Sequence, residues 1–246
     1  MHPLFRIPIV VAACLAFAHT ASAQTQTSVY YDYFDNDLVD LNPGDGLDPA
    51  ISFYGSSVTA SAVFYDTPDG TGVPRETLSS SATNGSASFS LQDSTAITTA
   101  YFTPSYGFAS TYTGIGSSSV ASDGINTFIL APYTAITFNV YGRVSELNDP
   151  YSTSLSTFTL IGRMQEADGQ FTEYTTSISS DAPPPTELLS LTLSAGATER
   201  YGTINFQSRQ TAAVLAVPEP GMAALMAAGL GLFGAGVRTR RRTADT

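Results

Sequence analysis

The chain has 246 residues and a formal net charge of −11, with one cysteine, two histidines and no tryptophan. Cys14, His2 and His19 all precede residue 24, and all ten basic residues are arginines. The sequence from residue 24 onward therefore excludes nucleophilic sites that need histidine or cysteine, His/Cys zinc sites, catalytic lysines and disulfide bonds.

The segment between residues 24 and 217 is strongly acidic. It contains 19 of the 21 acidic residues but five of the ten arginines, which gives it a net charge of −14. Such a charge repels nucleic acids and anionic membrane surfaces, and it favours divalent cations. We therefore expect no nucleic-acid partner, and no motif in the segment indicates a cofactor.

The first 23 residues have the three parts of a signal peptide. Arg6 provides a positive start, residues 7–17 are apolar, and a small-residue cleavage sequence follows. The predicted signal-peptidase site is formed by Ala21, Ala23 and Gln24, with Gln24 as the first residue of the mature chain. One alternative remains, because Val11-Ala12-Ala13-Cys14 fits a lipoprotein signal in which Cys14 would be lipidated.

Residues 24–216 are predicted to form one all-β domain, an antiparallel sandwich or jelly roll. Alternation is clearest over residues 134–144, where Ile136 and Phe138 point to one side and Asn139 to the other. Similar alternation predicts strands over residues 58–64, 87–91, 98–102, 157–161, 189–193 and 204–206. Turn signals separate the runs at Asn42-Pro43-Gly44, Pro68-Asp69-Gly70, Asn84-Gly85, Asp123-Gly124, Ala167-Asp168-Gly169 and Pro183-Pro184-Pro185.

Six aspartates gather between residues 32 and 48. Calcium prefers several oxygen ligands, so four of these residues are candidate Ca²⁺ ligands. The four are Asp35, Asp37, Asp40 and Asp45. A loop that starts at Asp40 departs from the EF-hand pattern, because its twelfth position is Ile51. The other interpretation is a solvated acidic loop near the start of the mature chain.

Two further kinds of site can be weighed from residue types. Glycosidases need two carboxylates across a cleft, and the available glutamates show no pairing in the sequence. They are Glu76, Glu146, Glu166, Glu173, Glu187 and Glu199. We therefore expect no enzymatic activity. Tyrosines in or beside the predicted strands could instead stack on sugars, with or without Ca²⁺, as in a carbohydrate-binding module. They are Tyr101, Tyr106, Tyr112, Tyr133, Tyr141, Tyr151 and Tyr174.

The C-terminal region, residues 217–242, has three consecutive parts. The short motif Val217-Pro218-Glu219-Pro220 comes first, and its two prolines favour an extended chain. Residues 221–237 contain no charged or polar side chain and would span about 25 Å as a helix, close to the thickness of the hydrocarbon core. A basic cluster of Arg238, Arg240, Arg241 and Arg242 follows. Since arginines concentrate on the cytoplasmic side, the body is expected outside.

This tail resembles the PEP-CTERM sorting signal of exported bacterial proteins. The resemblance implies recognition of Val217, Pro218, Glu219 and Pro220 by an exosortase, a membrane enzyme that cleaves near the motif. The expected path is export, a precursor anchored in the inner membrane, and final placement at the cell surface or in an extracellular matrix. The family association is with exopolysaccharide and biofilm, so the body would be a non-enzymatic surface or matrix protein.

Overall fold

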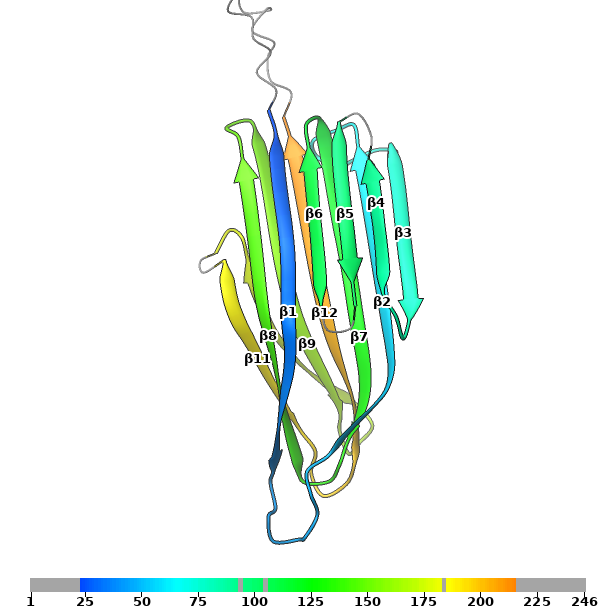
Figure 1. Ribbon diagram of the computed structural model, residues 1–246, viewed down its shortest axis with the longest axis vertical. Coiled ribbons are helices and arrows are strands. Elements are labelled where there is room, and N and C mark those ends of the chain that lie inside the picture. Colours follow the sequence, from blue (N-terminus) through cyan, green and yellow to red (C-terminus); the bar gives the residue numbers. More distant parts are fainter. Residues whose placement is uncertain (1–22, 93–94, 104–105, 183–184, 216–246) are drawn as a thin grey trace, which may run out of the picture. The chain divides into compact units, whose positions relative to one another are not determined.

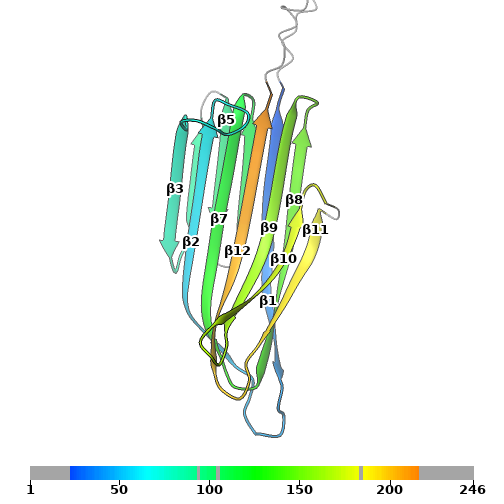
Figure 2. The ribbon, with the colours of Figure 1, turned by 180° about the vertical axis from the view of Figure 1, so that it is seen from behind.

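The described residues form twelve strands in two six-stranded antiparallel sheets that face each other as a sandwich (Figures 1 and 2). The computed structural model describes residues 23–92, 95–103, 106–182 and 185–215. It confirms the predicted all-β class. Within the described residues no helix is long and apolar enough to cross a membrane. The predicted signal peptide up to residue 22 and the segment 216–246 lie outside them.

The chain passes repeatedly from one sheet to the other, and some consecutive strands form hairpins within one sheet, namely β2–β3, β4–β5, β5–β6 and β9–β10. Sheet A has the order β11-β8-β1-β6-β5-β4. Its strands are β1 (Thr25–Asp40), β4 (Ala87–Gln92), β5 (Ala96–Phe102), β6 (Gly107–Thr113), β8 (Thr134–Asn148) and β11 (Thr186–Ser194). Sheet B has the order β10-β9-β12-β7-β2-β3. Its strands are β2 (Ile51–Tyr65), β3 (Glu76–Thr83), β7 (Gly116–Leu130), β9 (Ser152–Gln165), β10 (Phe171–Ser179) and β12 (Arg200–Val214).

The period-two alternation of the sequence places one side of each central strand in the core. Ile136, Phe138 and Val140 of β8 are completely buried, whereas Asn139 between them and Tyr141 after them point outward. The predicted alternation of β8 is therefore confirmed, and β8 continues past the predicted end to Asn148. Successive side chains of a strand point to opposite faces of the sheet. A strand that places its apolar side chains in the core therefore presents the alternate side chains to solvent.

Two local predictions are wrong. Asp123-Gly124 does not turn the chain but lies in the middle of β7. Asp123 forms an ion pair with Arg209 of β12 at 3.1 Å, and Gly124 pairs with Phe206 in the β7–β12 register. The tertiary contacts thus override a dipeptide that favours turns.

The second correction concerns the acidic segment, which is not wholly a loop. β1 extends to Asp40, so Asp35 and Asp37 lie in a strand that pairs with β8. Asp45 lies in the following β1–β2 connection.

The interior changes character along the strands. Toward the β1–β2 connection it is built from Phe, Leu and Ile side chains, and the ring of Tyr31 stacks on Phe158 and Phe206 at centroid distances of 4.8 and 5.5 Å. Toward the start of β1 it is lined by small polar side chains that are at most 2 % exposed. They include Thr25, Thr27, Thr98, Thr111, Thr113, Ser118, Ser122, Ser156, Ser208 and Gln210. Hydroxyl pairs such as Thr98–Thr111 and Ser122–Ser208, each at 2.8 Å, satisfy many of these polar groups.

The first strand, β1, begins at the same end of the sandwich at which the last strand, β12, finishes (Figure 1). The β8–β9 turn connects them there: the backbone N–H of Gln24 donates to the carboxylate of Asp149 at 2.8 Å, and that of Leu215 donates to the carbonyl of Tyr151 at 2.9 Å. The opposite end, with the β1–β2 connection, is therefore far along the strands from both ends of the described body.

Candidate functional site

The outer face of sheet A carries two neighbouring rows of side chains that run across the strands. The register aligns Arg143, Tyr30, Phe108 and Tyr101 from β8, β1, β6 and β5, and we call these four residues the aromatic row. The adjacent row has a hydroxyl at every position, and we call it the serine row. It contains Ser145, Ser28, Ser110, Thr99 and Ser90. Beyond it lies a third row of larger side chains: Leu147, Gln26, Tyr112, Ile97 and Gln92.

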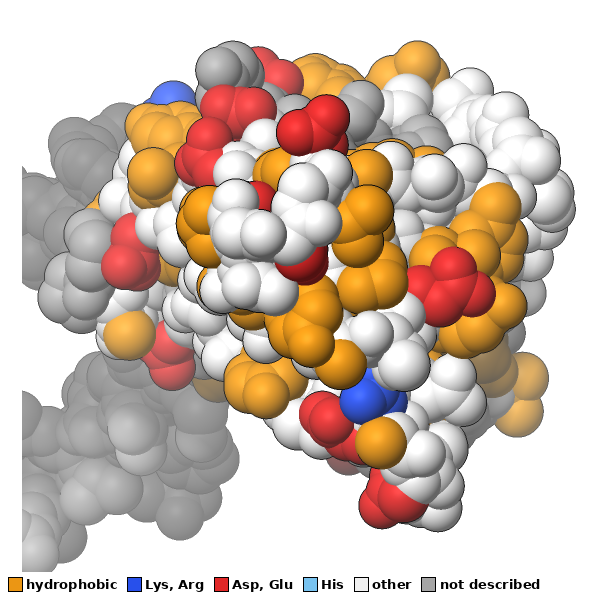
Figure 3. Space-filling view, turned by 90° about the horizontal axis from the view of Figure 1, so that it is seen from below, with side chains coloured by type: hydrophobic (Ala, Val, Ile, Leu, Met, Phe, Trp, Pro, Cys, Tyr) orange, Lys and Arg blue, Asp and Glu red, His pale blue; other side chains and the backbone are white. Residues whose placement is uncertain are grey.

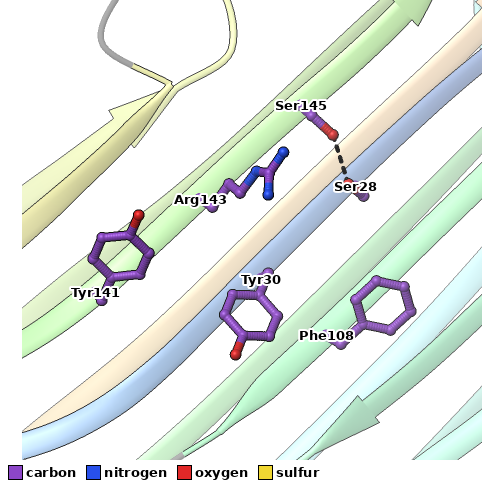
Figure 4. A pocket seen from close by; sticks show the side chains of 6 residues that line it. All are labelled: Ser28, Tyr30, Phe108, Tyr141, Arg143 and Ser145. Carbon is purple, nitrogen blue, oxygen red and sulfur yellow. Dashed lines mark hydrogen bonds between the residues drawn. The ribbon is translucent and has the colours of Figure 1, made fainter.

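A depression of about 530 Å³ opens where the first two rows cross β8, β1 and β6. Its lining residues are Ser28, Tyr30, Phe108, Tyr141, Arg143 and Ser145. Figure 4 shows the guanidinium of Arg143 between the Tyr141 ring and a pair of serines. The hydroxyls of these serines, Ser28 and Ser145, share a hydrogen bond of 2.7 Å. The site is therefore an open aromatic surface with one guanidinium group, that of Arg143, and two serine hydroxyls along one side.

Tyr30 is held in place by two neighbours. Its hydroxyl donates to the carboxylate of Asp32 at 2.7 Å, and its ring meets that of Tyr106 edge to face at 5.5 Å. The hydrogen bond to Asp32 raises the pKa of Tyr30 to about 12, because ionisation would break it and place two negative charges together. Tyr106 also packs on Tyr101, with ring centroids 6.0 Å apart. Contacts with Tyr106 and Asp32 thus orient the rings of Tyr30 and Tyr101 on this face.

Arg143 is distinguished from the other arginines of the body by having no hydrogen-bond or ion-pair partner among the described residues. The other four have such partners: Arg75 with Asp66, Arg163 with Glu173, Arg209 with Asp123, and Arg200 with the carbonyl of Gln165. An exposed arginine that contacts no internal acid keeps its five donors available for a ligand.

The structure brings together some of the tyrosines singled out from the sequence. Tyr101, Tyr106 and Tyr141 lie on or beside the aromatic row, and Tyr112 lies in the third row. Tyr133, Tyr151 and Tyr174 do not join them, since they lie in the β7–β8 turn, the β8–β9 turn and strand β10 of sheet B.

Four lining residues were missed by sequence reasoning: Ser28, Tyr30, Phe108 and Ser145. Their strand partners were not known, and no local pattern marks which outward residues share a row.

The candidate Ca²⁺ ligands serve local hydrogen bonds. Asp37 accepts from the side-chain amide of Asn139 at 3.1 Å, and Asp40 accepts from the backbone of Asn42 at 2.8 Å. Asp45 accepts from the backbone of Leu47 at 2.8 Å. Across the described ranges, no three acidic, histidine or cysteine side chains form a group that could hold a metal ion. The geometry of Asp35, Asp37, Asp40 and Asp45 therefore adds no support for calcium binding.

The glutamates considered for glycosidase chemistry do not meet in the depression. None of the six is among its lining residues, and two of them have other partners. Glu173 pairs with Arg163 at 2.7 Å, and Glu146 accepts from Ser180 at 3.0 Å.

Apolar side chains are also exposed at the end of the sandwich with the β1–β2 connection (Figure 3). Val39, Leu41, Leu47 and Tyr54 are each more than half exposed there. Acidic side chains lie among them in the same view, so this end combines scattered apolar atoms with negative charge. Tyr54 of β2 and Tyr201 of β12 meet edge to face, with ring centroids 6.4 Å apart.

Comparison with known families identifies the C-terminal segment. Residues 216–242 match the PEP-CTERM protein-sorting motif. The match includes the predicted motif at Val217–Pro220, the apolar run and the cluster of Arg238, Arg240, Arg241 and Arg242, and it confirms the resemblance. It implies an exported protein that is targeted to an exosortase, a membrane enzyme, for sorting to the surface. A search of curated proteins found no match.

Proposed function

We propose that this exported chain is a non-enzymatic protein of the cell surface or extracellular matrix, associated with exopolysaccharide and biofilm. Before sorting, the precursor is anchored in the inner membrane through residues 221–237, with Arg238, Arg240, Arg241 and Arg242 on the cytoplasmic side. An exosortase then cleaves near Val217–Pro220, and the sandwich is released or attached outside.

The sorting motif at residues 216–242 is the observation that carries this proposal. It follows directly on Leu215, the last described residue, which belongs to a compact unit that begins at Ala23. A non-enzymatic role is supported by the lack of His, Cys and Lys after residue 23 and by a depression whose lining residues include no carboxylate. Catalysis of hydrolysis or group transfer would need such groups in one place.

Cell fractionation tests the sorting part. Pro218, Glu219 and Pro220 are changed together to alanine, and the sandwich is followed with an antibody in membrane, surface and medium fractions. Wild-type protein is expected in the surface or medium fraction, and the triple variant is expected to stay full-length in the membrane. Thr239→Ala is the matched control, because it lies between the basic residues and leaves their charge unchanged. Equal distribution of the triple variant and the wild type would contradict exosortase recognition of the motif.

A second candidate function is carbohydrate binding, and the aromatic row favours it. Tyr30, Phe108 and Tyr101 lie side by side on neighbouring strands of an open face, as rings that stack on sugars would. Retardation of the mature protein in gels that contain soluble polysaccharides tests this function. Tyr101→Ser should reduce retardation, and Tyr174→Ser should not, because Tyr174 is similarly exposed but lies in sheet B.

A further inference from the structure

We propose that the outer face of sheet A binds a polysaccharide that carries carboxylate groups, with Arg143 as the residue that selects the acid. The inference rests on the carbohydrate-binding candidate above and adds the chemical class of the sugar and the direction in which the polymer lies.

The charge argument begins with the acidic body. A net charge of −14 between residues 24 and 217 repels an acidic polymer over most of the surface. Arg143 has no hydrogen-bond or ion-pair partner in the described part of the chain, and it lines the depression beside Tyr141 and Tyr30. A guanidinium in this position can donate two parallel hydrogen bonds to one carboxylate, a geometry that neutral hydroxyls do not match.

The rings next to Arg143 supply the surface for the sugar itself. Tyr30 and Phe108 follow Arg143 in the same row, and neighbouring strands are about 4.8 Å apart. Tyr101 extends the row by one more strand. A sugar that places its carboxylate on Arg143 therefore lies over Tyr30, and the next units of the polymer continue over Phe108 and Tyr101. Small isolated anions would gain nothing from these rings.

The serine row provides polar contacts along the same line. Its hydroxyls both donate and accept hydrogen bonds, as sugar hydroxyls require. Five strands contribute to the row, so it extends about 19 Å across the sheet. The row runs between larger side chains on both sides, namely the aromatic row and the row of Leu147, Gln26 and Tyr112. An open strip of this length suits an extended polymer lying across the strands better than an enclosed small molecule.

Paired polymers that differ only in charge test the inference. The mature protein purified from the producing cells is titrated with polygalacturonate, alginate and hyaluronate. Each polymer is compared with its methyl-esterified or carboxyl-reduced neutral form. We expect binding to at least one acidic polymer that is tenfold or more tighter than to its neutral form and that weakens with added salt, as for a charge-assisted pair. Arg143→Gln should remove this preference, and Arg143→Lys should retain part of it.

The control variant is Arg163→Gln, which removes an exposed arginine from sheet B. Urea unfolding midpoints of all variants establish that the sandwich is intact. Equal affinity for acidic and neutral forms, or an unchanged preference in Arg143→Gln, would overturn the acid selection but keep carbohydrate binding. Lack of binding to all six polymers would overturn both. Polyglutamate binding as tight as that of the best acidic polysaccharide would show that the rings do not recognise sugar, and it would also overturn the inference.

Discussion

Gly107→Ala should strongly destabilise the sandwich, although it adds one methyl group. A Cβ at this position would lie 2.1 Å from Cε1 of Tyr31 and 2.6 Å from Cδ1 of Phe102. Contact between carbon atoms is normally about 3.5–4.0 Å, so the Tyr31 ring must move by more than about 1 Å. It is 1 % exposed and lies against Phe158 and Phe206, which leave it no free direction.

Overpacking of this kind costs about 1–3 kcal/mol or more, and the loss of glycine flexibility in the unfolded chain offsets about 0.4–1 kcal/mol. We expect a net loss of about 2 kcal/mol and a decrease in melting temperature of about 4–8 °C for a domain of this size. Urea and thermal unfolding of the purified mature protein measure both. Gly44→Ala is the matched control, because none of the described residues beyond its two chain neighbours lies within 4 Å of the added Cβ. Equal unfolding midpoints for the two variants would refute the argument that the ring packing is fixed.

Three further predictions concern buried or strained groups. Burial raises the pKa of Tyr31 well above its ordinary value, so the unfolded state loses its proton first and stability should fall above pH 10. The free energy of unfolding, measured with urea between pH 10 and 11.5, should therefore fall less steeply in Tyr31→Phe, by about 1.4 kcal/mol per pH unit. An unchanged dependence on pH would contradict this prediction. Gln210 is 1 % exposed and neither polar side-chain atom has a hydrogen-bond partner in the described protein, so Gln210→Met should raise the free energy of unfolding by about 1 kcal/mol. A lower free energy of unfolding in Gln210→Met would show instead that the side-chain amide of Gln210 is hydrogen-bonded in the folded protein. Asn84 has a φ of 53°, and its side-chain oxygen accepts a hydrogen bond from the backbone N–H of Ser56 at 2.9 Å. Because glycine adopts a positive φ without strain and alanine does not, Asn84→Ala should lower the free energy of unfolding more than Asn84→Gly. The reverse order would refute the role of the left-handed turn.

The strands that could be predicted from the sequence are those with strong apolar alternation. Val58, Ala60, Ala62 and Phe64 of β2 are all buried, as their spacing requires. β7 was missed because its inward positions are largely Ser, Gly and Asn rather than apolar residues. Its burial follows from the hydroxyl pairs with other strands, and these are set by tertiary contacts that no local pattern reveals.

The candidate site could be predicted only in its residue types. Exposed tyrosines on a β-sheet were expected, but the row that joins Arg143, Tyr30 and Phe108 depends on the register of three strands from distant parts of the chain. A shift of one residue in β1 would turn Tyr30 into the core and Tyr31 outward. The sorting motif, by contrast, could be predicted from the sequence alone, because its three parts are contiguous.

The intact mass of the protein isolated from its own cells tests the central claim most directly. Export and exosortase sorting predict a chain that begins at Gln24 and lacks the residues beyond the Val217–Pro220 region, with any attached group added to that mass. Replacement of Pro218, Glu219 and Pro220 by alanine should instead give a chain that still ends at Thr246. If the wild-type mass includes residues 221–246, or if both proteins lose the tail alike, the motif does not direct processing and the account is contradicted.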